Sequence, residues 1–268
     1  MKCAFGSIST APAWWRGPKP MLPVAILAGG LATRLRPVTE TIPKALIDIN
    51  GEPFIAHQLR LLRGAGVERV VMCVGYLGEM IEAYAGDGSR FGLQVSYSPD
   101  GPNLRGTAGA VTNALPLLGE RFLVLYGDSY LPCDYQAVEH AFLKSGQPGL
   151  MTVFGNRNQW EKSNVELADG QIVAYDKRTR TDAMEYVDYG LSAFHSSVFS
   201  AEGGQAVDLA AVFQELIARH ALAGFEVRER FYEVGSWEGI QALQQYLALG
   251  TPRGPAMSRG PAMSRAQG

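Results

Sequence analysis

Two short segments of the sequence carry side chains suited to binding phosphate groups and a metal ion. The first places the Gly29-Gly30 pair after an apolar run, and Arg34 and Lys44 follow. Paired glycines let the backbone approach a ligand closely, their amide groups can bind an anion, and the two cations supply the positive charge that a triphosphate needs. The second segment, Gly127-Asp128, follows another apolar run and ends in a carboxylate that could hold Mg²⁺.

Each segment also has an ordinary structural interpretation. A glycine pair after a strand is usually only a turn, and an aspartate at a strand end more often caps or closes a turn than binds a metal. The first segment is neither a Walker loop nor a Gly-x-Gly-x-x-Gly fingerprint. The functional interpretation therefore depends on the two segments occurring together, each behind a strand, with Lys44 between them.

The elements expected around these segments alternate between strands and helices. Apolar runs predict strands at 22–27, 67–74, 93–97 and 122–126. Amphipathic spacing predicts helices at 53–63, 79–84 and 107–118, the last one capped by Thr107. Strands separated by helices of this length form right-handed crossovers and a largely parallel sheet. Because ligands bind at the carboxyl ends of such strands, both segments are expected in one crevice.

The pattern changes after about residue 150. Strands are predicted at 150–154, 165–167, 172–175, 186–194 and 226–231, and helices at 208–220 and 237–249. The segment 168–171 is typical of a β-hairpin turn. No linker divides the two halves, so we expect a single α/β domain with a mixed, mostly parallel sheet flanked by helices and a hairpin-bearing second half.

Composition excludes several classes of protein. The chain has 268 residues, of which 47% are hydrophobic, so it can fill a core. Its net charge of −2 argues against a nucleic-acid partner, and it has no apolar run of the roughly 20 residues that cross a bilayer. Three widely spaced cysteines and the lack of an apolar leader favour a cytoplasmic protein. The aperiodic ends, 1–20 and 251–268, are expected to be disordered, which leaves 21–250 as the domain.

The motifs together resemble those of the sugar-1-phosphate nucleotidylyltransferases, which include glucose-1-phosphate thymidylyltransferases and mannose- and heptose-1-phosphate guanylyltransferases. The matching segments are 27–37, 43–46, 106–110, 127–128, 176–177, 187–190 and 233–236. The resemblance implies a Rossmann-like mixed sheet whose second half binds the sugar. It also implies Mg²⁺-dependent transfer of a nucleoside monophosphate from a nucleoside triphosphate to a sugar 1-phosphate, with release of pyrophosphate.

The resemblance also implies roles for individual residues. Arg34 would neutralise the leaving phosphates, Lys44 would bridge the phosphates near the α-phosphorus, and Asp128 would hold Mg²⁺ together with Glu233. The expected nucleotide-binding residues are Leu27, Ala28, Gly29, Gly30, Gly106 and Thr107. The expected sugar-phosphate-binding residues are Asn164, Asp176, Lys177 and Asp188.

Two departures from the family pattern leave alternatives open. Ala32 stands where the family usually has glycine, and if the position needs a positive φ, alanine costs roughly 1–2 kcal/mol. Glu233 stands where aspartate is more common. Both would suit a catalytically silent nucleotide-sugar-binding regulatory protein. A cytidylyltransferase acting on a small phosphorylated alcohol or amine is a third possibility, against which Lys177 and Asp188 weigh. The base, the sugar and the oligomeric state stay open.

Overall fold

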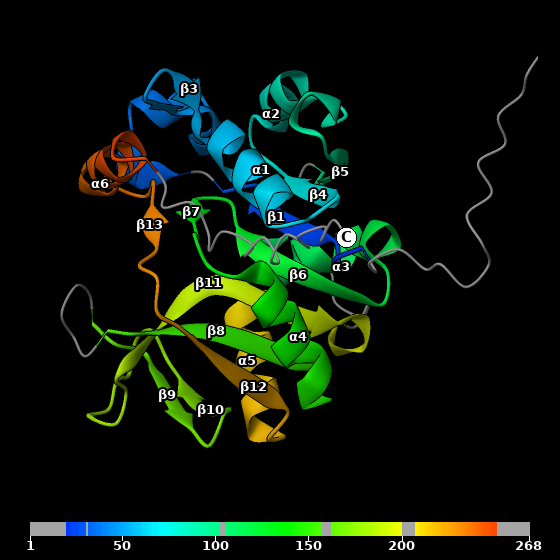
Figure 1. Ribbon diagram of the computed structural model, residues 1–268, viewed down its shortest axis with the longest axis vertical. Helices are drawn as coiled ribbons and strands as arrows, with labels where there is room; N and C mark the ends of the chain where they lie inside the picture. Colours follow the sequence, from blue (N-terminus) through cyan, green and yellow to red (C-terminus); the bar gives the residue numbers. More distant parts are fainter. Residues whose placement is uncertain (1–19, 31, 102–104, 157–161, 200–206, 251–268) are drawn as a thin grey trace, which may run out of the picture.

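Nine strands form one sheet in the order β5-β4-β1-β6-β11-β8-β12-β10-β9 (Figure 1). The computed structural model describes residues 20–30, 32–101, 105–156, 162–199 and 207–250. The strands of the sheet are β1 Val24–Ala28, β4 Arg69–Val74, β5 Gln94–Pro99, β6 Arg121–Tyr126, β8 Gly149–Gly155, β9 Val165–Ala168, β10 Gln171–Tyr175, β11 Tyr186–His195 and β12 Leu222–Val227. The two ends expected to be disordered lie outside the described residues, apart from residue 20.

Strand direction divides the sheet into two parts. The strands β5, β4, β1 and β6 are parallel neighbours, whereas β11 runs antiparallel to both β6 and β8. β8 and β12 are again parallel, and β9 and β10 form the predicted hairpin. Its two turn residues, Asp169 and Gly170, have φ angles of 49° and 75°, which match a type I′ turn. The predicted mixed α/β sheet with a hairpin-bearing second half is therefore confirmed. Parallel pairs do not predominate as expected: four of the eight neighbouring pairs are parallel, because the second half of the chain adds mainly antiparallel ones.

Helices pack on both faces of the sheet and make a three-layer arrangement (Figure 1). One face is covered by α1 Phe54–Gly64, α2 Gly78–Ala85 and α4 Tyr135–Ser145, and the other by α3 Gly106–Leu118 and α5 Leu209–Ala218. Side chains alternate along β1: Val24 and Ile26 pack against the first group, and Ala25 packs against the second. The run 122–126 is likewise buried on both faces, as its apolar sequence predicts.

A smaller unit sits at one end of this layered core. It consists of α6 Trp237–Ala248 and two short antiparallel pairs, β2 Asp48–Ile49 with β3 Glu52–Pro53 and β7 Ser129–Tyr130 with β13 Tyr232–Glu233. A third apolar cluster, which includes Phe54, Tyr130 and Leu243, holds the unit together. Pairing of Glu233 with Ser129 places the expected second carboxylate beside the loop that carries the first.

Three local predictions were wrong. No helix is predicted at α4, although Asp134 caps it by accepting a hydrogen bond from the amide of Ala137. The strand expected at 226–231 is β12, which starts four residues earlier, because α5 already ends at Ala218 and His220 takes a left-handed conformation that turns the chain directly into the strand. Thr107 does not cap its own helix, whose N-cap is Arg105.

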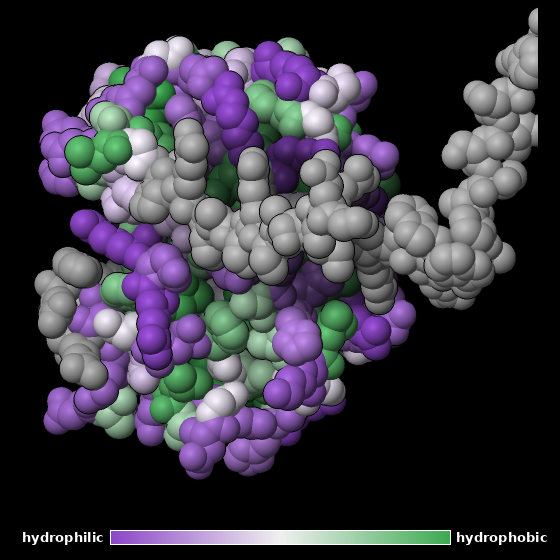
Figure 2. Space-filling view, viewed as in Figure 1, coloured by the Kyte–Doolittle hydropathy of each residue, from purple (hydrophilic) through white to green (hydrophobic). Residues whose placement is uncertain are grey.

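The surface shown in Figure 2 mixes hydrophilic and hydrophobic residues, and the hydrophobic ones appear in small separate groups. Within the described part of the chain, no helix combines the length and the apolar character that a membrane-spanning segment requires.

Candidate active site

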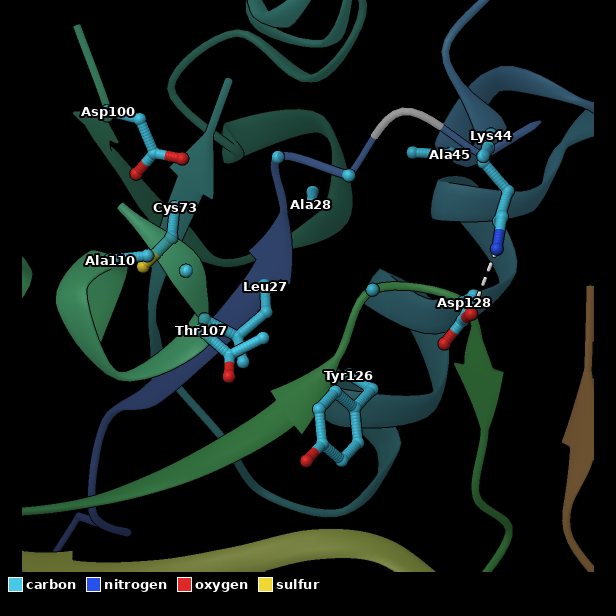
Figure 3. Close-up of a pocket in the computed structure, with 15 residues that line it drawn as sticks. Leu27, Ala28, Lys44, Ala45, Cys73, Asp100, Thr107, Ala110, Tyr126 and Asp128 are labelled. Atoms are coloured by element: carbon cyan, nitrogen blue, oxygen red, sulfur yellow. Dashed lines mark hydrogen bonds and ion pairs between the residues drawn. The ribbon is translucent and has the colours of Figure 1, made fainter. Parts of the chain in front are cut away.

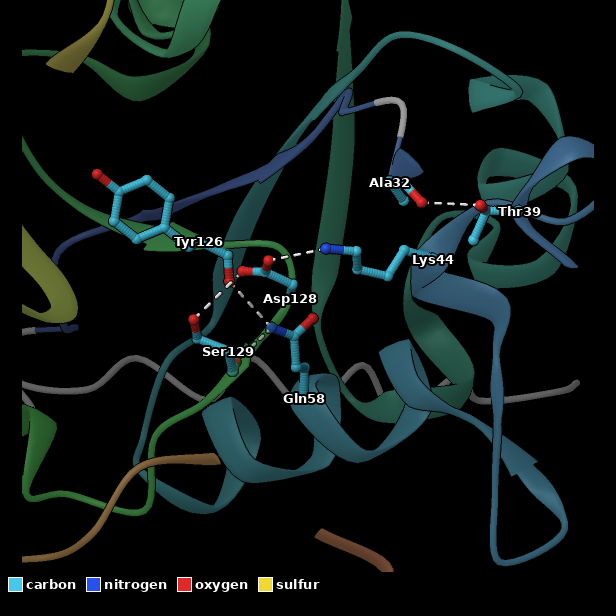
Figure 4. A network of polar contacts seen from close by, with 7 residues as sticks. All are labelled: Ala32, Thr39, Lys44, Gln58, Tyr126, Asp128 and Ser129. Carbon is cyan, nitrogen blue, oxygen red and sulfur yellow. Dashed lines mark hydrogen bonds and ion pairs between the residues drawn. The ribbon is translucent and has the colours of Figure 1, made fainter. Parts of the chain in front are cut away.

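Lys44 and Asp128 meet across the cleft that the sequence analysis predicted. Lys44 begins the 3₁₀ turn Lys44–Leu46, and Asp128 follows the end of β6. The ammonium nitrogen donates a hydrogen bond to a carboxylate oxygen of Asp128 at 2.9 Å (Figure 4). Both side chains are partly exposed, with 22% and 34% of their surface accessible. The pair therefore stands at the surface of the cleft, where a ligand can reach both charges.

The loop that carries Asp128 is fixed by close backbone contacts. The amide of Gly127 donates to the carbonyl oxygen of Leu27 at 3.0 Å, and a β-carbon at position 127 would lie only 2.3 Å from that oxygen. Gln58 of α1 donates to the carbonyl oxygens of Tyr126 and Ser129 at 3.3 and 2.7 Å (Figure 4). The loop is thus tied both to β1 and to α1, which holds the carboxylate in one position.

A first cavity of about 290 Å³ lies over the carboxyl ends of β1, β4 and β6 (Figure 3). All six residues expected to bind the nucleotide line it: Leu27, Ala28, Gly29, Gly30, Gly106 and Thr107. Lys44 and Asp128 line it as well. Most of the other lining residues are apolar or aromatic, among them Cys73, Ala110 and Tyr126. Such a lining suits a flat heterocycle with phosphate groups at one end.

A second cavity of about 490 Å³ adjoins the first and is far more polar. The two share Ala32, Lys44, Tyr126 and Asp128, so they form one continuous cleft. The charged and polar side chains that line the second cavity are Arg34, Lys44, Asp128, Asn164, Lys177, Arg180, Asp188 and Glu233. The structure therefore brings together, in this compartment, three of the four residues expected to bind the sugar phosphate.

Asp176 and Arg34 do not lie beside the other residues that were expected to bind the same substrate. Asp176 lines neither cavity, and its carboxylate instead accepts hydrogen bonds from the backbone amides of Arg178 and Thr179 at 2.7 and 3.0 Å. These bonds lower the pKa of Asp176. Arg34 lines the second cavity and not the first, so it stands apart from the six residues expected to bind the nucleotide.

The sugar side of the cleft is held by hydrogen bonds between neighbouring strands. The side-chain oxygen of Asn164 accepts from the amide of Asp188 at 3.2 Å. The Asp188 carboxylate accepts from the amide of Gly190 at 3.0 Å and from the Tyr175 hydroxyl at 3.3 Å. Burial raises the pKa of Asp188, and the nearby charge of Lys177 opposes that shift. These bonds fix the orientation of the Asp188 carboxylate, a hydrogen-bond acceptor that suits hydroxyl groups.

Thr107 connects the first cavity to a helix from the second half of the chain. Its hydroxyl donates to the carboxylate of Asp208 at 2.8 Å and accepts from the amide of Leu209 at 2.7 Å. Asp208 is the N-cap of α5. The hydroxyl that was predicted to cap α3 therefore joins the N-termini of α3 and α5, and its only proton is already donated to Asp208.

Ala32 has the left-handed backbone that its position in the motif led us to consider. Its φ is +48°. Its carbonyl oxygen accepts a hydrogen bond from the hydroxyl of Thr39 at 2.8 Å (Figure 4) and another from the amide of Leu35 at 3.2 Å. These two bonds hold the turn in a conformation that alanine disfavours.

The carboxylates of Asp128 and Glu233 could bind a metal ion that is also coordinated by substrate phosphates. Both carboxylates line the second cavity. Among the residues that the structure describes, no three His, Cys, Asp or Glu side chains gather closely enough to hold a metal by themselves. Mg²⁺ is commonly bound by one or two carboxylates together with substrate phosphates, and that arrangement needs no larger protein cage. These residues are therefore compatible with Mg²⁺.

Several lining residues were absent from the sequence prediction. Asp100 follows β5 directly, at the carboxyl end of a parallel strand, which is a signal that the sequence analysis could have used. Tyr126 ends the apolar strand β6 and was treated as core only. Arg180 lies in an irregular segment and carries no recognisable pattern.

Comparison with known proteins places the chain among enzymes of one kind. The family model described as Nucleotidyl transferase matches residues 24–248. The N-acetylmuramate alpha-1-phosphate uridylyltransferase of Neisseria meningitidis is 43% identical over 113 residues, which are 42% of this chain and 49% of that protein. The catalytic subunit beta of mannose-1-phosphate guanylyltransferase from Xenopus tropicalis is 30% identical over 179 residues, 65% of this chain and 49% of that protein. The match thus spans about half the length of these curated relatives.

Solved structures share the same architecture. A protein from Bacillus anthracis described as a glucose-1-phosphate thymidylyltransferase superposes with a TM-score of 0.76 at 18% identity, over 87% of this chain and 98% of that one. The HddC protein of Yersinia pseudotuberculosis, complexed with GMP-PN, superposes with a TM-score of 0.70 at 21% identity, over 85% of this chain and 100% of that one. At these identities the likeness concerns the fold.

Proposed function

This chain belongs to the nucleotidyl transferase family, and from that premise we propose that it transfers a nucleoside monophosphate from a nucleoside triphosphate to a sugar 1-phosphate. The names of its relatives support this reaction, since they act as uridylyl- or guanylyltransferases on sugar 1-phosphates. The observation that carries the proposal is the continuous cleft, with an apolar compartment at one end, a polar one at the other, and Lys44 and Asp128 where the two join.

The reaction needs alignment more than covalent help. A phosphate oxygen of the sugar 1-phosphate forms a bond to the α-phosphorus, and the bond from that phosphorus to the bridging oxygen of pyrophosphate breaks. Both reactants are anions, so their repulsion must be offset while they are held in line. Lys44 lines both compartments and can contact phosphate on either side of the reacting centre. Arg34, Lys177 and Arg180 add positive charge to the compartment of the sugar phosphate.

The remaining groups position the two substrates. Asp188 and Asn164 would accept and donate hydrogen bonds to sugar hydroxyls, because both line the polar compartment. Asp128 and Glu233 would hold Mg²⁺, which when bound would offset negative charge on the phosphates. We also propose a cytoplasmic location, because that compartment supplies nucleoside triphosphates.

A pyrophosphate-release assay tests the proposed reaction. The full chain is incubated with MgCl₂, each of GTP, UTP, dTTP, CTP and ATP, and each of a panel of 1-phosphates of glucose, mannose and N-acetylmuramate. We expect pyrophosphate only when both substrates are present, with the nucleotide sugar as second product. Binding of nucleotide sugars without turnover would instead support the silent regulatory protein. Turnover of CTP with phosphocholine or another small phosphorylated alcohol or amine would support the cytidylyltransferase.

A further inference from the structure

The ammonium group of Lys44 contacts one of the two oxygens through which Asp128 would bind a metal ion. Lys44 Nζ donates to Oδ2 of Asp128 at 2.9 Å (Figure 4). The hydroxyl of Ser129 donates to the other oxygen, Oδ1, at the longer distance of 3.3 Å. Both carboxylate oxygens therefore accept a hydrogen bond from the protein itself, and the shorter bond comes from a positive charge.

Of the two partners in this ion pair, Asp128 has the more firmly held position. The amide of Val234 donates to the backbone carbonyl oxygen of Asp128 at 2.9 Å, and the preceding residue, Gly127, donates to the carbonyl oxygen of Leu27 at 3.0 Å. The backbone is thus bonded on both sides of the carboxylate. Lys44 reaches the same carboxylate through a flexible four-carbon stem, and 22% of its side chain is exposed. If the pair opens, Lys44 is therefore the residue that moves.

A metal ion and the Lys44 ammonium would compete for Oδ2 of Asp128. Mg²⁺ binds carboxylate oxygens at about 2.0–2.1 Å and demands a nearly octahedral set of ligands. An ion on Oδ2 would lie within a few ångströms of the ammonium nitrogen, and two positive charges repel each other strongly at that separation. The ion pair and the metal site therefore exclude each other at this oxygen.

A second lysine in the same compartment carries the same charge without this contact. Lys177 lines the second cavity together with Lys44 and Asp128. Its ammonium nitrogen lies 5.8 Å from the ring centres of both Tyr126 and Tyr175. Among the described residues, the ion pair of Asp128 is made by Lys44 and not by Lys177. The two lysines therefore allow direct competition to be separated from the general charge of the compartment.

We propose that Lys44 keeps divalent metal ions off Asp128 until a nucleoside triphosphate draws its ammonium group onto the phosphates. The proposal rests on the proposed function. Lys44 lines both compartments, so its ammonium can leave Oδ2 for a phosphate within the same cleft. A triphosphate carries several negative charges and Asp128 carries one, so the phosphates attract the ammonium more strongly. The freed oxygen can then share a metal ion with the phosphates.

Binding of Mn²⁺ alone, without nucleotide or sugar phosphate, tests the proposal on the full chain. Mn²⁺ prefers the same oxygen ligands as Mg²⁺, and electron paramagnetic resonance distinguishes the free ion from the bound one. In Lys44→Met the side chain keeps a similar length but loses its charge and its donors. At about 0.15 M salt, this variant should bind Mn²⁺ about tenfold or more tightly than the wild type.

Two further variants identify the cause and the place of this gain. Lys177→Met removes the same charge from the same compartment and should change the Mn²⁺ affinity less than about twofold, because it leaves Oδ2 of Asp128 paired with Lys44. Lys44→Met combined with Asp128→Asn should lose the gain, because the carboxylate that binds the ion is gone. If Lys44→Met does not fold, Lys44→Gln takes its place and should shift the affinity in the same direction.

Three results would overturn the proposal. The first is equal Mn²⁺ affinity in the wild type and in the Lys44 variant. The second is an equal gain in Lys177→Met, because the effect would then come from the general charge of the compartment. The third is a gain that persists when Asp128→Asn is added, because the ion would then bind elsewhere.

The result is separable from the proposed function. If the Lys44 variant gains Mn²⁺ affinity as expected but the wild type releases no pyrophosphate with any substrate pair, the transfer reaction is refuted and the competition at Asp128 stands. If the wild type releases pyrophosphate but the Lys44 variant binds Mn²⁺ no more tightly, the competition is refuted and the transfer reaction stands.

Discussion

At the scale of single residues, Lys44 is the side chain from which the proposed chemistry can best be tested. Its ammonium group contacts Asp128 and lines both compartments. Because the pair is partly exposed, it adds at most about 1 kcal/mol to the free energy of unfolding. Its charge would act mainly on the transition state, where a preorganised group of this kind contributes about 3–4 kcal/mol.

Lys44→Ala is therefore expected to lower kcat for pyrophosphate release about 10²–10³-fold while the melting temperature changes little. The control is Lys144→Ala, which removes an exposed lysine at the end of α4. Steady-state kinetics and thermal unfolding of both variants check the prediction. Full activity of Lys44→Ala would refute the role assigned to this residue.

Ala32 tests whether the unusual turn carries backbone strain. Its φ of +48° costs alanine roughly 1–2 kcal/mol in the folded state, and glycine avoids this cost. Glycine also gives the unfolded chain more conformational freedom, which offsets about 0.5–1 kcal/mol of that gain in stability. Ala32→Gly should therefore raise the free energy of unfolding by up to about 1.5 kcal/mol.

The same substitution in a helix should act in the opposite direction. Ala83→Gly, at an exposed position within α2, is expected to lower the free energy of unfolding by about 0.5–1 kcal/mol. Urea denaturation of the two variants beside the wild type checks the pair. A loss of stability in Ala32→Gly equal to that in Ala83→Gly would show that the turn at Ala32 is unstrained.

At the scale of elements, the N-terminus of α5 links stability to nucleotide binding. Asp208 caps this helix and also accepts a hydrogen bond from Thr107, whose neighbour Gly106 lines the first cavity. Asp208→Ala should lower the free energy of unfolding by about 1 kcal/mol, the usual loss for a cap, and raise the KM for the nucleoside triphosphate.

Asp134→Ala provides the matched comparison for this prediction. Neither aspartate lines a cavity, but Asp208 also accepts a bond from Thr107 of the first cavity, whereas Asp134 caps α4 by accepting from Ala137, which lines neither. Asp134→Ala should lose a similar amount of stability with no change in KM. Urea denaturation and initial-rate kinetics measure both quantities, and an equal rise in KM for the two variants would refute the link through Thr107.

The elements that could be predicted from sequence are those with a strong local pattern. Continuous apolar runs located β1 and β6, and an Asp-Gly turn located the β9–β10 hairpin. The start of β12 could not be located in the same way, because α5 passes into it through a single left-handed residue, His220, and no glycine or proline marks the boundary. The short pairing of β7 with β13 joins segments about a hundred residues apart, and no local signal announces it.

At the scale of the whole molecule, buried carboxyl groups set part of the dependence of stability on pH. Burial raises the pKa of Asp100 above the value near 3.9 of an unfolded chain. Between those two pKa values the folded state binds more protons than the unfolded state, so this group makes stability fall as pH rises.

Asp100→Asn should remove that contribution. The variant is expected to be more stable than the wild type at pH 7, by about 1 kcal/mol, and the difference should shrink as pH falls toward 4. Urea denaturation at several pH values measures it. A difference that is constant with pH, or that grows as pH falls, would show that the carboxyl group is not destabilising when ionised.

The sequence predicts the location of the cleft better than it predicts which individual residues line it. Motif residues from both halves of the chain do line one cleft, and Lys44 and Asp128 do meet there. Asp100 directly follows a predicted strand and could have been included on that ground, whereas the position of Arg180 depends on how an irregular segment packs, which residue types alone do not encode. Asp176 was expected in the site, but its carboxylate instead accepts hydrogen bonds from backbone amides of its own turn.

Tyr126 is one wall of both compartments, and this constrains how the protein can acquire new substrates. Asp100 and Asp188 each face a single compartment, so a change at either can alter tolerance for one substrate without disturbing the other. A change at Tyr126 alters the shape offered to both at once. Laboratory evolution toward a new sugar should therefore accept substitutions around Asp188 freely and keep Tyr126 constant unless the nucleotide is exchanged in the same experiment.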